Sequence, residues 1–435
     1  MNMNICLGLF IGAAMGMSSA SAKVFVNSMC HMKASSDKQV IEGDKNKNKK
    51  YPLASISKVV TSLWAVEELG PEYRYKTKLH LKQVSENTYN IHIEGSRDPL
   101  FGRGSSYFII SELNRLGIKN IENLSFDENF LLEWQVEEGV RVAGDTPYYR
   151  TIDDQAEAIH RSLLRDFGTP IFKSAYNTLS KRAEKKGVRM AKNPFVSLKR
   201  VDFVPSQTFA KTPDMTTLVY QSAPLKTILK NMNNQSNNYI ADHLYWNLGG
   251  TDAFKSFMKK ALDVGPDEFE FHLGSGNNAN YIYDPAKDIY NKATCETMIK
   301  VLFKLDKRLE KSGLELTDVM AVAGSDTDST VAGFQGNFRG ATIAKTGSVN
   351  RAKTLAGTVS TKTGDIYFTI LVNTNGPREW GVAQNVIKNK LNFLMINNGG
   401  PRRFQYDEVI TLPFDAKSVL QEETPAPVVA AAAQG

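Results

Sequence analysis

Residues 339–373 read RGATIAKTGSVNRAKTLAGTVSTKTGDIYFTILVN, and this stretch decides the fold class. Three segments of it are rich in β-branched and apolar residues, and residues that favour turns separate them. Such a succession predicts strands joined by tight hairpins, and therefore an antiparallel sheet. Amphipathic segments predict helices before and after it, at residues 222–232, 238–249, 251–265, 292–305 and 379–395. The expected fold class is α/β (α+β), an antiparallel sheet flanked by helices.

The middle of the chain has a different pattern. From Tyr75 onward it shows short alternating strands, the first two meeting at a polar turn, and then helical segments with many charges. We therefore predict a smaller inserted domain at 76–204, within a main domain formed by 23–75 and 205–412. The low-complexity residues 421–435 are predicted to be a disordered tail.

The N-terminal residues have the pattern of an export signal. Met1–Met17 are almost free of polar side chains, and Ala20 and Ala22 then stand at the −3 and −1 positions of a cleavage site. The apolar run is too short for a permanent membrane anchor, although it lacks the usual preceding Lys or Arg. We expect a signal peptide at 1–22, a short strand at 23–29, and a secreted, periplasmic protein without a stable membrane anchor. A buried N-terminal helix is the alternative.

Charge and cysteine content narrow the function further. The net charge of +7 is spread along the chain. Nucleic-acid binding needs basic clusters interleaved with aromatic residues, so nucleic acid is not expected as a partner. A mild positive field favours substrates rich in carboxylates. Only Cys30 and Cys295 remain after signal cleavage, so two free buried thiols are expected, with one bridge as the alternative. No C-x-x-C or H-E-x-x-H spacing occurs, and neither a metal nor a cofactor is expected.

A serine and a lysine begin the first strong helix of the sequence. The segment LASISKVVTSLWAVEELG, residues 53–70, has helical spacing of its apolar residues and ends at Gly-Pro. Ser55 and Lys58 at i and i+3 share one face of this helix, on a side expected to be buried. Burial lowers the pKa of a lysine, and a neutral amine can activate a serine hydroxyl as nucleophile. An ordinary capped helix with a surface lysine is the alternative.

Two further motifs follow in order. Ser236-x-Asn238 lies between two predicted helices, where it serves either as a helix cap or as a proton relay and substrate amide. Lys345-Thr346-Gly347, with Ser348 behind it, ends the first predicted strand. A strand edge can pair with an extended peptide, and a glycine permits close approach of another backbone.

Other copies of these short motifs lack a suitable context. Ser256 and Lys259 point away from the apolar face of their predicted helix, and Ser35 lies in a polar loop before Lys38. The second Lys-Thr-Gly copy, at 362–364, lies between two predicted strands and is interpreted as a hairpin turn.

Order, spacing and surroundings of the three motifs resemble the serine penicillin-recognising enzymes, in particular the low-mass class C penicillin-binding proteins. These form the D-alanyl-D-alanine carboxypeptidase/endopeptidase family. The resemblance extends to IEGSRDPLFG, YQSAPLKTILKNMNNQSNNYIADHLYWNLGG, HLGSGNN, AVAGSDTDST and AKTGSVNRAKTLAGTVST, and covers most of 51–375. It implies the penicillin-recognising serine transpeptidase/β-lactamase-like fold. It also implies peptidoglycan peptides as substrates and β-lactam antibiotics as covalent inhibitors.

The family pattern implies roles for eight residues. These are the acyl-forming nucleophile Ser55 and its base Lys58, the proton relay and anchor Ser236 and Asn238, and the carboxylate-binding strand with Lys345, Thr346, Gly347 and Ser348. Ser348 stands where members usually have Thr, and the interval between the first two motifs is shorter than in better-known members. One of their two inserted domains is therefore expected to be trimmed or missing.

Alternatives remain on the sequence alone. A serine β-lactamase or an esterase of the same fold would use the same Ser55 and Lys58, but the segment that supplies a deacylating water in class A β-lactamases has no counterpart. A Ser-His-Asp hydrolase lacks its Gly-x-Ser-x-Gly turn. A wall sensor that is acylated by penicillin without turnover is the non-enzyme alternative.

Overall fold

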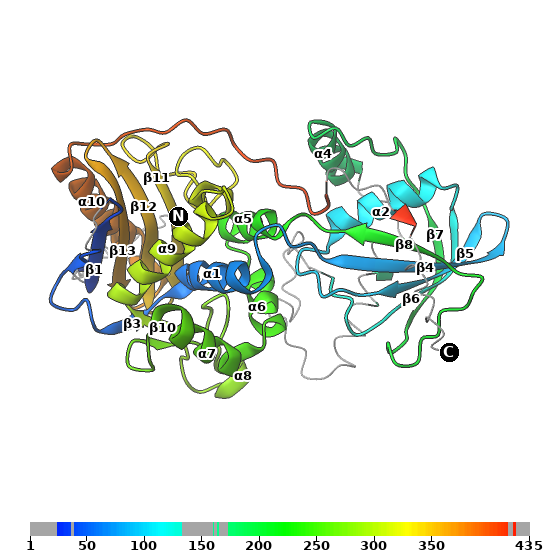
Figure 1. Ribbon diagram of the computed structural model, residues 1–435, viewed down its shortest axis with the longest axis horizontal. Coiled ribbons are helices and arrows are strands. Elements are labelled where there is room, and N and C mark those ends of the chain that lie inside the picture. The colour runs from blue at the N-terminus through cyan, green and yellow to red at the C-terminus, as the bar shows by residue number, and fades with distance from the viewer. Residues whose placement is uncertain are drawn as a thin grey trace, which may run out of the picture.

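Two lobes lying side by side make up the molecule (Figure 1). The computed structural model describes residues 24–35, 39–132, 160, 163–164, 173–415 and 421–422. We call residues 24–70 and 222–400 the large lobe, and the described part of 75–221 the small lobe. Residues 401–415, the C-terminal strap, run from the large lobe across to the small lobe.

The main sheet of the large lobe has five strands in the order β11-β12-β13-β1-β2, all antiparallel. Their bounds are Ser28–Lys33 (β1), Glu42–Gly43 (β2), Thr342–Val349 (β11), Ala352–Thr361 (β12) and Gly364–Asn373 (β13). The three strands predicted within 339–373 are confirmed, as is the turn at 362–364. The strand predicted at 23–29 begins only at Ser28, because pairing with Leu371 of β13 sets its start. A smaller sheet joins β3 (Lys50–Pro52), β10 (Lys292–Thr294) and β9 (Phe269–Glu270).

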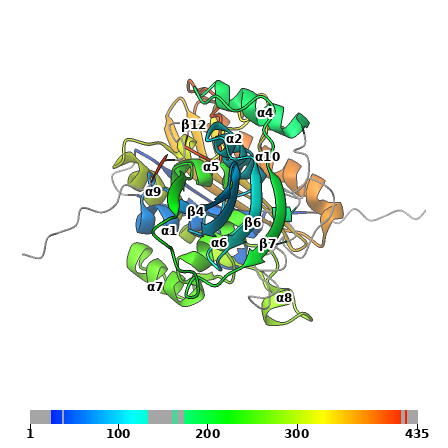
Figure 2. The ribbon, with the colours of Figure 1, turned by 90° about the vertical axis from the view of Figure 1, so that its right-hand side faces the viewer.

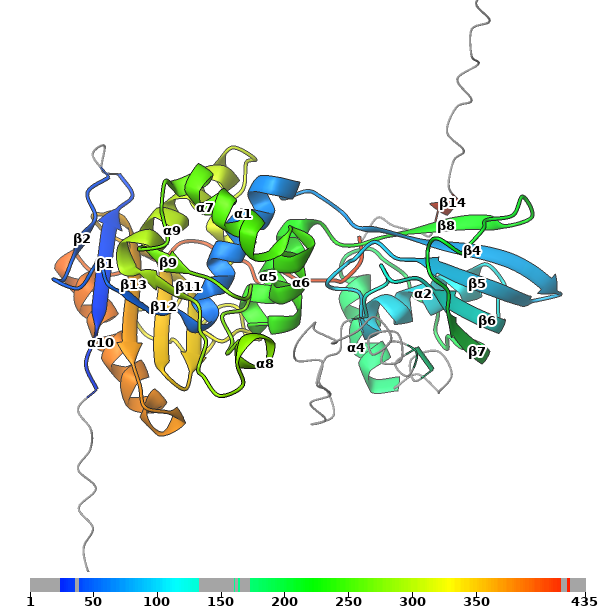
Figure 3. The same cartoon turned by 90° about the horizontal axis from the view of Figure 1, so that it is seen from below.

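Helices cover both faces of the main sheet (Figure 1). On one face lies α10 (Trp380–Asn397), and on the other α9 (Cys295–Glu310) and α1 (Ser57–Leu69). The remaining helices are α5 (Leu225–Gln235), α6 (Asn238–Asn247), α7 (Gly250–Leu262) and α8 (Asn280–Tyr283), with short 3-10 turns η1 (Ala54–Ile56), η3 (Leu316–Asp318) and η4 (Pro377–Glu379). Seen from below, α5 and α6 lie on the side of the large lobe that faces the small lobe (Figure 3).

Helix α1 is the centre of the larger core. Its residues from Ser57 to Val66 are all buried, and Trp64 packs edge-on against Tyr245 and Phe254. Burial of aromatic groups of this size stabilises a domain by several kcal/mol, roughly 25 cal/mol per Å² of apolar surface. Helix α1, which carries Lys58 and directly follows the turn with Ser55, is therefore held rigidly.

The small lobe is built on a six-stranded sheet in the order β14-β8-β4-β5-β6-β7, seen end-on in Figure 2. Its strands are β4 (Lys76–Ser85), β5 (Thr88–Glu94), β6 (Asn120–Phe126), β7 (Ser197–Phe203), β8 (Thr216–Gln221) and β14 (Gln421–Glu422). Its described residues include the helices α2 (Arg103–Arg115) and α4 (Lys173–Glu184). The polar turn between β4 and β5 is where the sequence predicts it. A separate apolar core lies between this sheet and its helices.

Two segments outside 76–204 also belong to the small-lobe sheet. Strand β8 pairs with β4, with Thr77 opposite Tyr220. Gln421 and Glu422, predicted as disordered, pair with the outer edge of β8 instead. An unpaired strand edge is a template for such pairing. The domain boundaries drawn from the sequence stay a prediction, and residues 423–435 lie outside the described residues.

The C-terminal strap contacts both lobes. Tyr406 donates a hydrogen bond to Asp326 of the large lobe at 2.6 Å. The ring of Phe414 stacks on Phe108 of α2, with 4.1 Å between ring centroids, and Arg74 pairs with Asp415 at 3.0 Å. The strap thus ties the lobes together, and its end pairs with the chain crossings themselves, since Phe414 forms a β-bridge with Ser222 and the Ala223 N–H donates to the Pro413 carbonyl.

A disulfide joins Cys30 of β1 to Cys295, the first residue of α9, so the prediction of two free thiols is wrong. The two Cα atoms lie 5.8 Å apart, within the usual range for a bridge. Because β1 packs against α9 only in the tertiary structure, a sequence separation of 265 residues gave no hint of the pairing.

The predicted signal peptide at 1–22 lies outside the described residues. Among the helices of the described ranges, none combines the length and the apolar character that crossing a membrane requires.

Candidate active site

Ser55 and Lys58 meet at the start of α1. Ser55 lies in the turn η1, after Ala54, whose φ of 51° is unusual for a residue with a side chain. Lys58 is fully buried, and its Nζ donates to Ser55 Oγ at 3.1 Å. Backbone strain of this kind is often found beside reacting groups. The predicted pair is therefore in hydrogen-bond contact.

Two further acceptors surround the Lys58 amine. Nζ donates to Asn238 Oδ1 at 2.7 Å and to the carbonyl of Ser275 at 3.2 Å. Burial lowers the pKa of Lys58 to about 7, against the opposing effect of the Asp242 carboxyl. A neutral amine keeps two hydrogens for the two carbonyl oxygens. Its lone pair then faces Ser55 and can accept the hydroxyl proton.

The three consecutive residues of the second motif, 236–238, make different contacts. Asn237 caps α6, because its side chain accepts from the backbone N–H of Ile240 at 3.1 Å. Ser236 ends α5 in the left-handed conformation, with φ of 56°. Its hydroxyl accepts from Lys345 Nζ at 2.9 Å, while Asn238 contacts Lys58. The capping alternative thus holds for Asn237, whereas Ser236 and Asn238 face the two lysines.

The third motif lies on β11, the outer strand of the five-stranded sheet. Lys345 is fully buried and also donates to the carbonyl of Thr346 at 2.9 Å. Burial, followed by the neighbouring charges of Lys58 and Lys353, holds the pKa of Lys345 well below its usual value. A Cβ on Gly347 would lie 2.8 Å from the carbonyl of Leu53. Only glycine therefore lets β11 pack against the turn that carries Ser55.

Comparison with known proteins agrees with this geometry. The sequence matches the D-Ala-D-Ala carboxypeptidase 3 (S13) family over residues 27–152 and 202–391. The chain belongs to this family. It is a serine peptidase with the penicillin-recognising fold, so the predicted fold and enzyme class are confirmed.

Several solved structures are similar to this S13 peptidase. It is similar to Bd3459, a predatory endopeptidase from Bdellovibrio bacteriovorus solved in complex with the immunity protein Bd3460. The two are 53% identical over 92% of this chain and 100% of that chain, with a TM-score of 0.88. The penicillin G acylated form of Bd3459 matches at 52% identity over the same shares, with a TM-score of 0.85. Penicillin binding protein 4 from Haemophilus influenzae shares the fold at 20% identity, over 85% of this chain and 96% of that chain, with a TM-score of 0.55. No protein with a curated description matches the sequence.

Three residues of the S13 peptidase site, Asp242, Thr330 and Lys353, lie outside the three motifs. Asp242 accepts from the Ser275 N–H at 2.6 Å, Thr330 accepts from Thr346 Oγ1 at 2.9 Å, and Lys353 donates to Ser348 Oγ at 2.7 Å. An acidic residue on the buried face of a predicted helix was the one available signal, and it applies only to Asp242. The other contacts depend on loop conformation and strand register.

The motif copies rejected from the sequence lie elsewhere. Ser256 donates to the carbonyl of Asp252 on the exposed side of α7, and Lys259 pairs there with Asp263. Lys362 lies in the turn between β12 and β13. Lys38 lies outside the described residues. Within the described part of the chain, no three His, Cys, Asp or Glu side chains gather as a metal site would require.

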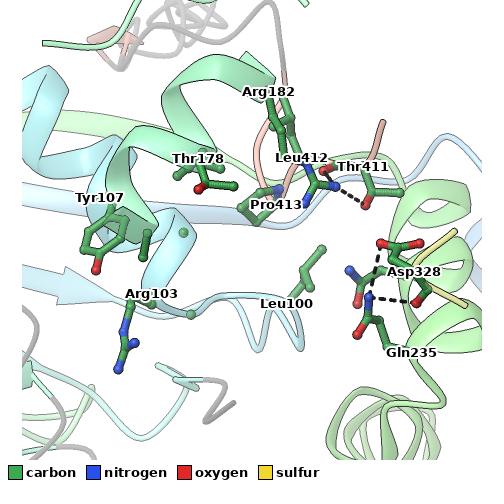
Figure 4. Close-up of a pocket in the computed structure, with 15 residues that line it drawn as sticks. Leu100, Arg103, Tyr107, Thr178, Arg182, Gln235, Asp328, Thr411, Leu412 and Pro413 are labelled. Carbon is green, nitrogen blue, oxygen red and sulfur yellow. Dashed lines mark hydrogen bonds between the residues drawn. The ribbon is translucent and has the colours of Figure 1, made fainter. Parts of the chain in front are cut away.

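A cavity of about 340 Å³ lies between the lobes, next to the second motif (Figure 4). Gln235, which precedes Ser236, and Asp328 line it from the large lobe and are hydrogen-bonded at 3.2 Å. Arg182 lines it from the small lobe and donates to the carbonyl of Thr411 in the strap. None of the eight predicted site residues lines this cavity, so it adjoins the reacting groups without containing them.

Proposed function

We propose that this S13 peptidase is exported and cleaves both terminal D-Ala and D-Ala-containing cross-links of peptidoglycan, through an acyl-enzyme on Ser55. The contact of Lys58 Nζ with both Ser55 Oγ and Asn238 Oδ1 carries the proposal, since it joins the base, the nucleophile and a substrate amide at one point. The family match supports the D-Ala-D-Ala substrate.

Acylation begins at Ser55. Neutral Lys58 takes the hydroxyl proton while the oxygen attacks the carbonyl of the penultimate D-Ala. The backbone N–H groups of Ser55 and Ser348 stabilise the developing oxyanion, and such donors are typically worth about 10²–10³ in rate. Asn238 binds the peptide from the side. Residues 321–323 pair with the outer edge of β11 at 342–344, so the substrate backbone pairs with the edge that follows, from Lys345 onward.

Departure of the amine requires a proton. Ser236 supplies it, because its hydroxyl lies 2.9 Å from Lys345 Nζ and can be re-protonated from that amine. The C–N bond then breaks and leaves an ester on Ser55. Transfer of the proton that Lys58 took from Ser55 back to Lys345 returns both amines to their starting states. Neutral Lys58 then takes a proton from water, which hydrolyses the ester, and gives that proton to Ser55 as the serine leaves.

Cross-link cleavage differs only in the leaving group. Relatives more than half identical are endopeptidases, and one was solved as a penicillin adduct. The interval between the first two motifs is short, so less inserted chain is available to cover the site. A bulky leaving group therefore meets fewer obstacles. The net charge of +7 helps to gather wall peptides that carry carboxylates.

Purified protein incubated with dimeric muropeptides tests the proposal. Mass analysis should show monomers appearing together with free D-Ala, and Ser55→Ala should release neither. Release of D-Ala from intact dimers would contradict the endopeptidase part. Covalent labelling by penicillin with no release of any product would favour the wall sensor instead.

A further inference from the structure

A second lysine reaches the hydroxyl of the third motif from the neighbouring strand. In the antiparallel pairing of β11 with β12, Lys353 lies directly opposite Ser348, so both side chains project from the same face of the sheet. Lys353 Nζ donates to Ser348 Oγ at 2.7 Å and lies 5.8 Å from the ring centroid of Trp380. Lys353 is partly exposed, so its ammonium lies beside Ser348 within reach of a ligand from solvent.

The charge of Lys353 is not balanced locally. Among the described residues, no carboxylate oxygen lies within 4.0 Å of its Nζ. Burial alone acts on its pKa, which is lowered, with no acidic neighbour to oppose it. A half-buried cation without a counter-ion is costly unless an anion arrives to pair with it.

Lys345 is poorly placed to supply the charge for a substrate carboxylate. It is completely buried, and it already donates to Ser236 Oγ and to the carbonyl of Thr346. The same burial holds the pKa of Lys345 well below the usual value, which disfavours its protonated, positively charged form. Lys353, by contrast, is partly exposed and donates to Ser348 on the same strand pair.

We propose that Lys353 is a substrate-binding residue, whose ammonium pairs with the carboxylate of the leaving-group residue together with the Ser348 hydroxyl. The inference rests on the proposed function, because it places the leaving group along β11. Ser348 Oγ accepts from Lys353 and so keeps its own hydrogen for a second acceptor. One carboxylate can thus receive a hydrogen from each of the two groups, in a charge-assisted pair.

The ligand class follows from this chemistry. Terminal D-Ala carries a carboxylate next to the amine that leaves, and penicillins carry one at the corresponding side of the reacting ring. A merely structural Lys353, which orients Ser348 or packs on Trp380, would serve charged and neutral substrates alike. Substrates that differ only in this carboxylate therefore separate the two roles.

The test compares a peptide ending in D-Ala-D-Ala with its C-terminal amide. For Lys353→Met, kcat/KM on the free acid should fall about 10- to 100-fold, the usual loss of a hydrogen bond to a charged group, while the amide changes less than about threefold. Lys353→Arg, which keeps the cation, should retain most of the preference for the acid. Lys362→Met, at the other end of β12, is the matched control and should change neither value.

Equal losses on acid and amide would overturn the proposal, and so would an unchanged kcat/KM on both. Acylation by penicillin and by its methyl ester gives a second, peptide-independent comparison with the same expected pattern. Wild-type protein that is acylated by penicillin yet cleaves neither peptide would refute the proposed function alone, and the penicillin pair would still decide the role of Lys353. Thermal unfolding of each variant identifies losses that come from misfolding.

Discussion

Asp242 and Lys58 bind the backbone N–H and the backbone carbonyl of the same residue, Ser275. The Asp242 carboxylate accepts from the Ser275 N–H at 2.6 Å, and Lys58 donates to the Ser275 carbonyl at 3.2 Å. Both side chains are buried, and burial moves both pKa values to about 7, raising that of Asp242 and lowering that of Lys58. The protonation of the proposed base is therefore linked to a carboxyl that does not touch the nucleophile.

Asp242→Asn should shift the pH dependence of acylation. An ionised Asp242 stabilises the Lys58 ammonium and so raises the pKa of Lys58, opposing the effect of burial. Removing that charge lowers the pKa of Lys58, and the rate should rise at lower pH than in the wild type. Lys345, the other charged group beside Lys58, stays unchanged. Penicillin acylation rates between about pH 5 and 9 measure the shift.

Asp98→Asn is the matched control for this experiment. Asp98 is also fully buried with a pKa raised to about 7, but it lies in the small lobe, between β5 and α2. Its replacement should leave the pH profile in place. A profile of Asp242→Asn that stays at the wild-type position, or moves to higher pH, would contradict the link to Lys58.

Fluorescent penicillin should label the protein covalently at Ser55. Ser55→Ala should abolish labelling, and Lys58→Ala should slow it by about 10²–10⁴-fold, the usual loss of a general base. Ser256→Ala, on the exposed side of α7, should label like the wild type. Peptide mapping that finds the adduct on Ser256 or Ser35 would reject the assignment of the nucleophile.

The two Lys-Thr-Gly copies should respond differently to the same change. Lys345→Met removes the amine that contacts Ser236, so acylation and peptide cleavage should both fall at least about tenfold. Lys362→Met alters an exposed hairpin turn and should be nearly silent. Gel-based labelling over a time course compares the two rates, and the reverse ranking would show that the site uses the second copy.

Loss of the disulfide should destabilise the protein without rearranging its site. Cys30→Ser combined with Cys295→Ser is expected to lower the free energy of unfolding by about 2–5 kcal/mol, as for other native bridges. Urea unfolding measures the loss, and reduction of the wild type by dithiothreitol should reproduce it. Equal unfolding curves for the oxidised and reduced proteins would show that the bridge adds nothing.

Local chemistry explains which parts of the fold were predictable. Strands β11 to β13 and helix α1 carry their patterns within short windows, and the hairpin at 362–364 has its own turn residues. The start of β1 was misplaced, because its pairing with β13 joins segments more than 300 positions apart in sequence. The Cys30–Cys295 bridge was missed for the same reason.

Some residues of the site could likewise be predicted from the sequence, and others could not. The three motifs bring their own residue types, and the eight predicted residues lie on η1, α1, β11 and the α5–α6 junction. Lys353 was not predictable, because its contact with Ser348 depends on the register of two strands. Asp242 acts on Lys58 across Ser275, a contact that only the loop conformation creates.

Both lobes need segments from late in the chain to complete their folds. Leu412 and Phe414, close to the C-terminus, complete the apolar core of the small lobe, and β1 finds its partner only when β13 has been made. A chain that emerges N-terminus first cannot close either core until nearly all of it is available. Such late closure suits the export proposed above, because threading through a membrane requires an unfolded chain. Under that proposal, Ser55 and β11 come together only after nearly the whole chain has crossed.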